Sequence, residues 1–125
     1  MKLYFAPGAC SLAPHIVANE LGINIDLEQV DIREKKTKSG GDYWAINPKG
    51  QVPTPKLDTG ERLTEVPALL QYLSDQKPAA GLAPAAGTME RYRLLEWLNF
   101  VTAELHKTFG PMFRPTTLFH GYVGL

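Results

Sequence analysis

Two prolines, Pro53 and Pro55, interrupt a stretch whose neighbours Val52 and Leu57 are typical of a β-strand. Proline donates no hydrogen bond to a neighbouring strand, so it is confined to sheet edges, bulges and turns. The stretch GQVPTPKL (50–57) therefore predicts either an ordinary proline on an edge strand or a special turn. A cis peptide bond at Val52–Pro53 is the special case, although only about 5–6% of X–Pro bonds in folded proteins are cis.

The residues around this stretch alternate between strand and helix patterns. Ser11 can cap the first helix, and Pro14 lies in its first turn, where proline is tolerated. The predicted elements are, in order, a strand (2–6), a helix (11–22), a strand (24–32), a mobile loop (33–42), a turn (47–50), a hairpin with its loop at 58–60, and a helix (65–75). This order predicts an α/β domain of thioredoxin-like fold, with helices packed on a mixed four-stranded sheet. In that layout the loop before the third strand faces the helix that follows Cys10, which favours the cis bond.

The second part of the chain begins after a stretch rich in proline, glycine and alanine, QKPAAGLAPAAG. We therefore predict a domain over residues 1–77, a linker over 78–87, and the first helix of an all-α domain within 88–125. The long helix, expected over 88–113, has apolar residues every three or four positions. A single helix cannot bury such a face, so partner helices are expected.

Composition excludes several classes of function. The 125 residues hold 13 Lys and Arg against 13 Asp and Glu, so no net charge attracts nucleic acid or an anionic membrane. The single Cys10 excludes an internal disulfide and a multi-cysteine zinc site. The sequence has neither a signal-peptide pattern nor about 18 consecutive apolar residues, so we expect a cytoplasmic protein.

Cys10 is the first candidate for chemistry, because it lies between a strand and a helix. Free N–H groups and the dipole at a helix N-terminus lower the pKa of a thiol, which predicts a thiolate. The alternative is a small buried apolar side chain, and the residues leave both open. Ala13 stands where a Cys-x-x-Cys pair would have its second cysteine, so dithiol exchange is not expected. His106, on the long helix, is either a donor or base near a thiol or a solvated surface residue.

Four motifs occur together, namely APGACS, NPKGQVP, LTE-x-x-A-x-x-QYL and RYRLLEWLNFVTAELHKTF-x-P-x-FRP. In this order and spacing the chain resembles the bacterial beta-class glutathione S-transferases over residues 1–117. The resemblance implies a thioredoxin-like domain followed by an all-α domain, a homodimer, and glutathione as co-substrate without a metal.

The resemblance also implies roles for residues of the first domain. Cys10 would lie beside the glutathione sulfur and form a mixed disulfide with it. The main chain of Val52, before the cis-proline at Pro53, would pair with the cysteinyl part of glutathione. Lys35 would reach the glycyl end.

Four residues of the long helix match the family's helix that closes over the thiol: Asn99, Ala103, Glu104 and His106. Of these, Glu104 is a candidate to serve the neighbouring subunit, and His106 would assist the thiol chemistry.

The chain departs from the family pattern in several places. Glu65 and Val66 match the position that holds the γ-glutamyl end, but Val66 stands where many relatives have serine, and Pro67 removes one helix N–H. The hydroxyl contact to the ligand carboxylate is therefore missing, and one such hydrogen bond to a charged group is worth roughly 1.5–3 kcal/mol. The family continues through several more helices where this sequence reads LFHGYVGL (118–125), which indicates a C-terminally truncated member.

The resulting interpretation is a glutathione transferase that conjugates glutathione to electrophiles, with glutathione-dependent thiol exchange through Cys10 as an additional activity. Two alternatives remain open. One is a non-catalytic glutathione-binding or protein-interaction module of the same fold, and the other is a monothiol glutathione-dependent reductase.

Overall fold

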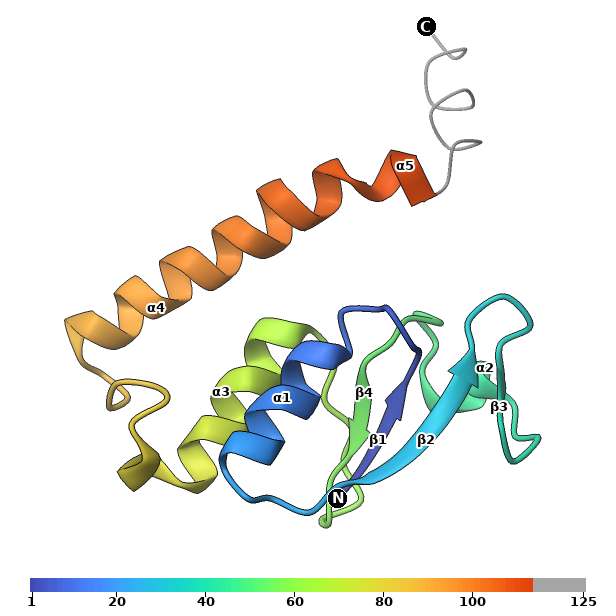
Figure 1. Ribbon diagram of the computed structural model, residues 1–125, viewed down its shortest axis with the longest axis horizontal. Coiled ribbons are helices and arrows are strands. Elements are labelled where there is room, and N and C mark those ends of the chain that lie inside the picture. Colours follow the sequence, from blue (N-terminus) through green and yellow to red (C-terminus); the bar gives the residue numbers. More distant parts are fainter. Residues whose placement is uncertain (114–125) are drawn as a thin grey trace, which may run out of the picture. The chain divides into compact units, whose positions relative to one another are not determined.

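The computed structural model describes residues 1–113, which form two compact units divided between Ala83 and Pro84 (Figure 1). The elements of the first unit are β1 (Lys2–Phe5), α1 (Leu12–Glu20), β2 (Asp26–Asp31), β3 (Lys36–Thr37), α2 (Tyr43–Ile46), β4 (Thr54–Lys56), α3 (Val66–Gln76) and a 3₁₀ turn (Pro78–Ala80). Those of the second unit are α4 (Met89–Phe100), a π-helical segment (Val101–His106) and α5 (Gly110–Phe113). No helix within residues 1–113 has both the length and the hydropathy needed to cross a membrane.

The first unit contains the mixed four-stranded sheet that the sequence predicts. The strand order is β3-β2-β1-β4, in which β1 and β2 run parallel and the two outer pairs run antiparallel. Leu3 of β1 pairs with Leu27 on one side and with Pro55 on the other. Because β4 is an edge strand, Pro55 lies where a missing N–H costs no central ladder bond.

One prediction about this sheet is wrong, and another is confirmed only in part. Residues 33–42, expected as a mobile loop, contain the edge strand β3, which pairs Thr37 with the buried Val30. The hairpin with its loop at 58–60 forms, because the N–H of Leu57 donates to the Glu61 carbonyl (2.8 Å) and Arg62 makes an antiparallel bridge to Lys56, but this single bridge does not make the return segment a strand. The fourth strand is therefore β3 rather than the hairpin return, and burial of the Thr37–Val30 pair explains why a polar segment becomes a strand.

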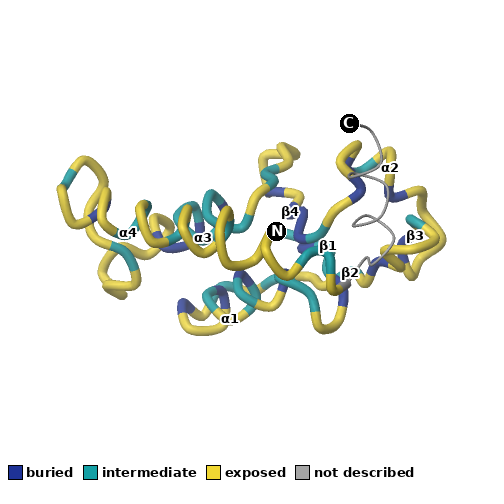
Figure 2. Tube along the Cα trace, turned by 90° about the horizontal axis from the view of Figure 1, so that it is seen from above, coloured by how far each residue is buried: buried dark blue, intermediate teal, exposed yellow. Residues whose placement is uncertain are grey.

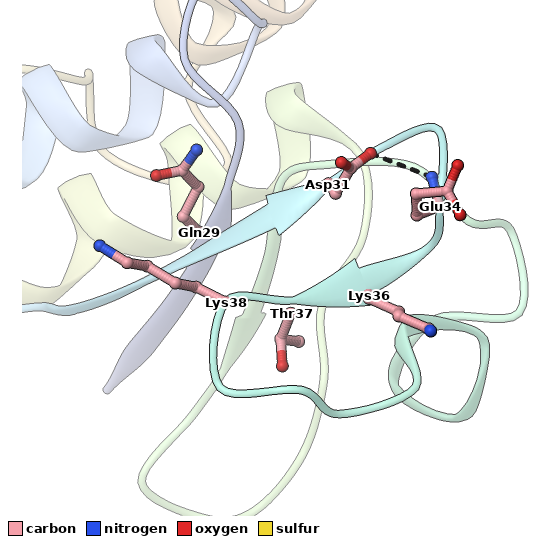
Figure 3. A pocket seen from close by; sticks show the side chains of 6 residues that line it. All are labelled: Gln29, Asp31, Glu34, Lys36, Thr37 and Lys38. Atoms are coloured by element: carbon pink, nitrogen blue, oxygen red, sulfur yellow. Dashed lines mark hydrogen bonds between the residues drawn. The ribbon is translucent and has the colours of Figure 1, made fainter.

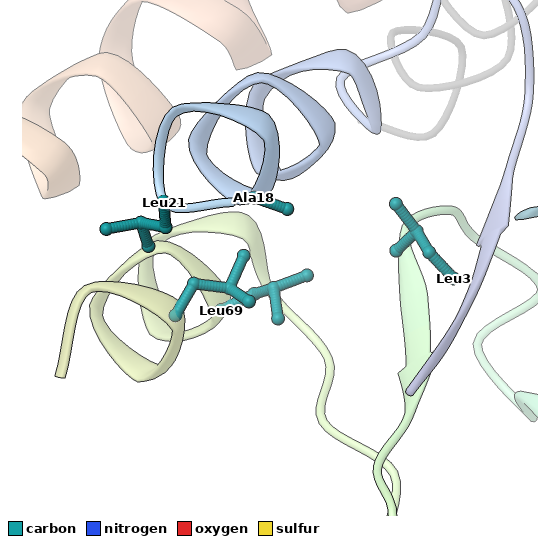
Figure 4. Packing of buried hydrophobic residues seen from close by; sticks show 5 residues of the cluster. Leu3, Ala18, Leu21 and Leu69 are labelled. Carbon is teal, nitrogen blue, oxygen red and sulfur yellow. The ribbon is translucent and has the colours of Figure 1, made fainter. Parts of the chain in front are cut away.

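The core of the first unit lies between the sheet and two helices. Leu3 of β1 faces Ala18 of α1, Leu21 just after that helix and Leu69 of α3, and Leu73 completes the cluster (Figure 4). All five side chains are buried. This packing fixes α1 against the sheet and thereby positions the residues that precede α1.

The second unit starts with a capped helix. The hydroxyl of Thr88 accepts a hydrogen bond from the N–H of Arg91 (3.3 Å), and Arg91 Nε donates to the carbonyl of Pro84 (2.7 Å). Among residues 84–112, for which burial is described, Arg91 alone is buried. Most of α4 is exposed (Figure 2).

The single long helix predicted over 88–113 is interrupted in the structure. After α4 the chain continues as a π-helical segment, and a turn at Phe109 precedes α5. Gly110 and Pro111 follow that turn, and both residue types disfavour an uninterrupted α-helix. The interpretation of residues 118–125 concerns a part of the chain outside the described residues.

Candidate functional site

The structure brings together the thiol of Cys10 and the main chain of Val52. Cys10 follows the turn after β1, and its Sγ donates to the Val52 carbonyl at 3.3 Å. The Val52–Pro53 peptide bond is cis, which confirms that prediction. A thiol and an edge of main chain from segments 42 residues apart thus form the centre of the candidate site.

Ser11 supports Cys10 in a way that the sequence did not indicate. It occupies the N-cap position of α1, but its side chain makes no capping hydrogen bond. Its hydroxyl instead accepts from the N–H of Ala6 (3.2 Å) and donates to the carbonyl of Ala6 (3.1 Å). The prediction of a side-chain cap is therefore wrong, and the buried hydroxyl ties the end of β1 to the start of α1.

The pKa of the Cys10 thiol is raised above its ordinary value. Burial is the largest cause, and the negative charge of Glu65 adds to it, while a hydrogen bond from the backbone N–H of Cys10 acts in the opposite direction. The predicted lowering by the helix terminus is wrong for this structure, since desolvation of the anion outweighs the N–H groups. Cys10 is thus a thiol, which agrees with its role as donor to Val52.

A buried polar network holds the loop that carries Val52. The Tyr43 hydroxyl donates to the Gln51 carbonyl (2.7 Å) and lies 2.9 Å from Thr54 Oγ1, and Asn47 Nδ2 donates to the same two oxygens (2.8 and 2.9 Å). Sequence reasoning missed this network, although the Asn47-Pro48 turn was a signal that Asn47 bonds locally. The network holds the loop at Gln51 and at Thr54, which lie on either side of Val52 in the chain.

Lys35 belongs to the same region. Its Nζ donates to the carbonyl of Gly50 (2.6 Å) and lies 5.3 Å from the centroid of the Trp44 ring. Gly50 is two residues before Val52, so the structure places the predicted Lys35 at the loop that carries Val52.

Glu65 precedes α3 with a positive φ of 74°, and Val66 is the first residue of that helix. The carboxylate of Glu65 pairs with Lys49 Nζ at 2.8 Å, and the same nitrogen donates to Thr64 Oγ1 at 3.0 Å. Sequence reasoning missed Lys49, because nothing local distinguishes it from a solvated lysine. Both charged groups are more than half exposed, so this ion pair contributes little to stability.

The remaining predicted site residues belong to the second unit. Asn99 lies on α4, and Ala103, Glu104 and His106 lie in the π-helical segment. All four are exposed. A π-helical turn within a helix is frequent at functional sites, because it changes which side chains share a face.

A hollow of about 370 Å³ opens at the β3 edge of the sheet (Figure 3). Its lining residues are Gln29, Asp31, Glu34, Lys36, Thr37 and Lys38. None of them is a predicted site residue. The lysines lie on or beside the edge strand, where charge opposes pairing with another chain.

Comparisons with known proteins give one consistent result. A family model described as "Glutathione S-transferase, N-terminal domain" matches residues 8–76. The glutathione S-transferase GstA of Escherichia coli O157:H7 is 50% identical over 117 residues, which are 94% of this chain and 58% of the relative.

Solved structures agree with this match. The beta-class glutathione S-transferase of Sphingomonas chungbukensis is 53% identical with a TM-score of 0.90, over 92% of this chain and 57% of that protein. A sphingomonad glutathione S-transferase complexed with glutathione is 53% identical with a TM-score of 0.89, over the same shares. The chain thus spans a little more than half the length of each of these proteins.

Proposed function

Because this chain belongs to the glutathione S-transferase family, we propose that it binds glutathione through its first unit and conjugates it to electrophilic compounds. We further propose that it acts in the cytoplasm as a homodimer. The observation that carries the proposal is the meeting of the Cys10 thiol and the Val52 main chain at 3.3 Å beside the cis Val52–Pro53 bond.

The peptide-like part of glutathione fits the main chain at Val52. Strand-like pairing of a ligand with exposed main chain supplies hydrogen bonds without requiring particular side chains. In this arrangement the glycyl carboxylate would lie toward Lys35, whose ammonium bonds to Gly50 of the Val52 loop, and the γ-glutamyl end toward Glu65 and Val66. A relative of 53% identity has been solved as a complex with glutathione.

On glutathione binding, the single S–H of Cys10 would turn from the Val52 carbonyl to the glutathione sulfur and act there as a hydrogen-bond donor. Its raised pKa keeps it protonated near neutral pH, and an S–H donor stabilises a neighbouring thiolate. The glutathione thiol would give its proton to His106, with Asn99, Ala103 and Glu104 closing over the sulfur, Glu104 from the neighbouring subunit. The thiolate would then form a C–S bond to the electrophile, and the leaving group would depart with the electron pair of its bond to carbon.

A non-catalytic glutathione-binding module is the alternative. A protonated Cys10 bonded to Val52 fits this module as well as it fits the transferase, because neither requires Cys10 to be the nucleophile. The same observation weighs against a monothiol reductase and against thiol exchange through Cys10, since both require Cys10 to attack as a thiolate.

The proposal is tested by calorimetric titration of the purified chain with reduced glutathione, with Cys10→Ser alongside. We expect saturable binding of one glutathione per chain, because the first unit carries the Val52 edge, Lys35 and Glu65. Cys10→Ser keeps a donor at the same place, so it should bind glutathione within a few-fold of the unaltered chain.

Turnover separates the transferase from the binding module. Thioether formation with an activated aryl halide, absent in His106→Ala, supports the transferase. Binding without any thioether across a panel of electrophiles supports the module instead. No binding at millimolar glutathione would overturn both.

A further inference from the structure

Trp44 lies in α2 beside the predicted carboxylate-binding lysine, and half of its surface is exposed. Its ring contacts two groups of the site. The Lys35 ammonium lies 5.3 Å from the ring centroid, and a Cβ built on Gly50 would lie only 2.6 Å from Trp44 Cζ3. The indole therefore packs directly on Gly50, where only a glycine leaves room for it.

Lys35 is consequently held from two sides. Its Nζ donates to the Gly50 carbonyl at 2.6 Å, while the face of Trp44 attracts the positive charge. A lysine side chain otherwise loses considerable rotamer freedom when it orders around a ligand. Holding Lys35 in place beforehand removes part of that entropic cost from binding.

We infer that Trp44 is a positioning residue that holds the Lys35 ammonium for the glycyl carboxylate of glutathione. This rests on the proposed function, because the ligand is the glutathione assigned there. Trp44 acts through Lys35 rather than by touching the reacting sulfur. The ammonium has three donors, and its bond to Gly50 leaves others for a carboxylate. Gly50 is two residues before Val52, so one loop fixes the lysine and the main-chain edge together.

The first test is a calorimetric double-mutant cycle with reduced glutathione, using Trp44→Leu, Lys35→Met and the double variant. Cation–π pairs at exposed sites correspond to a change in Kd of about two- to fivefold, and we expect that loss in Trp44→Leu. Trp44→Phe keeps an aromatic face and should restore most of the affinity. In the Lys35→Met background, Trp44→Leu should cause no further loss. An equal loss in both backgrounds would overturn the inference.

The second test needs no ligand. The chain has two tryptophans, so Trp97→Phe leaves Trp44 as the only indole. An ammonium over the ring concentrates anions there, and Lys35→Met should therefore reduce quenching of Trp44 by iodide but not by neutral acrylamide. Lys38→Met removes the same charge from a neighbouring exposed lysine and should leave iodide quenching unchanged. Equal iodide quenching with and without Lys35 would overturn the inference.

The two tests separate this inference from the proposed function. If the unaltered chain binds no glutathione, the proposed function fails, and the ligand assigned to Lys35 fails with it. The chain could instead bind glutathione while the losses of affinity in the cycle are additive, or while iodide quenching of Trp44 does not depend on Lys35. In either case only the positioning role of Trp44 is overturned.

Discussion

At Cys10 two opposing effects act on one sulfur atom. The start of α1 offers N–H groups that favour the thiolate, whereas burial and the charge of Glu65 favour the thiol. The raised pKa means that the second effect is larger. The protonated sulfur is also the form that can donate to the Val52 carbonyl, at 3.3 Å.

We predict that Cys10 titrates above the pH at which free cysteine does. Because the chain has one cysteine, thiolate absorbance at 240 nm reports this residue once the tyrosine signal of Cys10→Ser is subtracted. A raised folded pKa means that the folded protein binds the proton more tightly than the unfolded chain. The stability contribution is thus fully present below the unfolded pKa and is lost as pH rises through the folded one. Titration at or below the pH of free cysteine would contradict this.

We predict that Tyr43→Phe destabilises the first unit. Tyr43 is fully buried, and the change removes the hydroxyl between Gln51 and Thr54. The free energy of unfolding should fall by about 1–2 kcal/mol in urea, since Asn47 still donates to both oxygens. Tyr92→Phe, at an exposed tyrosine, is the matched control and should change it by less than about 0.5 kcal/mol. Equal effects of the two changes would mean that the network does not hold the loop.

At the residue scale, the sequence shows which residues carry functional groups better than it shows what surrounds those groups in the folded protein. Cys10 and Val52 could be found because a helix start and a proline are local signals. The raised pKa of Cys10 could not, because it depends on burial and on Glu65, 55 positions away in the chain. The contact between Trp44 and Gly50 could not be predicted either, because it depends on how the loop folds and no sequence pattern indicates it.

At the element scale, the junction between β1 and α1 depends on one buried hydroxyl. Ser11 closes a ring of hydrogen bonds to Ala6, and Cys10 lies within that ring. Such a junction differs from an ordinary helix cap, because the hydroxyl bonds to main chain that precedes the helix. The position of the thiol is thus tied to the end of β1 as well as to α1.

We predict that Ser11→Ala costs more stability than Thr88→Ala. Ser11 is buried, and its loss leaves the polar groups of Ala6 without this partner, at about 1–3 kcal/mol. Thr88 makes a conventional cap to Arg91, worth about 1 kcal/mol. Because the two residues lie in different units, urea unfolding is followed by the fluorescence of Trp44 for Ser11→Ala and of Trp97 for Thr88→Ala. A smaller loss for Ser11→Ala would show that the hydroxyl does not secure the junction.

Strands and helices set by local pattern agree with the prediction, and those set by distant partners do not. The apolar patterns of β1, β2, α1 and α3 identify these elements. Strand β3 has only two residues and forms because Thr37 is buried against Val30, so no local period reveals it. The π-helical segment after α4 is similarly hidden, because the apolar spacing of residues 94–112 reads as an ordinary helix.

At the scale of the whole molecule, apolar burial is unequal between the units. The cluster around Leu3 and Leu69 lies entirely within the first unit. In the described part of the second unit several large apolar side chains of α4 remain exposed, including Trp97, whose ring packs edge-on against Phe100. The first unit therefore has a core of its own, whereas the helices of the second need partners to be stable.

We predict that the two tryptophans report different unfolding transitions. Trp97→Phe leaves Trp44 in the first unit, and Trp44→Phe leaves Trp97 in the second. In urea, Trp44 should show one cooperative transition, because α2 belongs to the unit that contains the core. Trp97 should change over a broader range at lower urea, since helices without a buried apolar face unfold with little cooperativity.

Leu69→Ala distinguishes this arrangement from a single cooperative domain. Removing a leucine from the core costs about 2–5 kcal/mol, so the Trp44 transition should move to lower urea. The Trp97 transition should stay in place, because Leu69 belongs to the other unit's core. Coincident transitions that shift together would mean that the two units unfold as one. In that case residues 84–113 would draw stability from the core around Leu69, and the exposed side chains of α4 would not set the stability of the second unit.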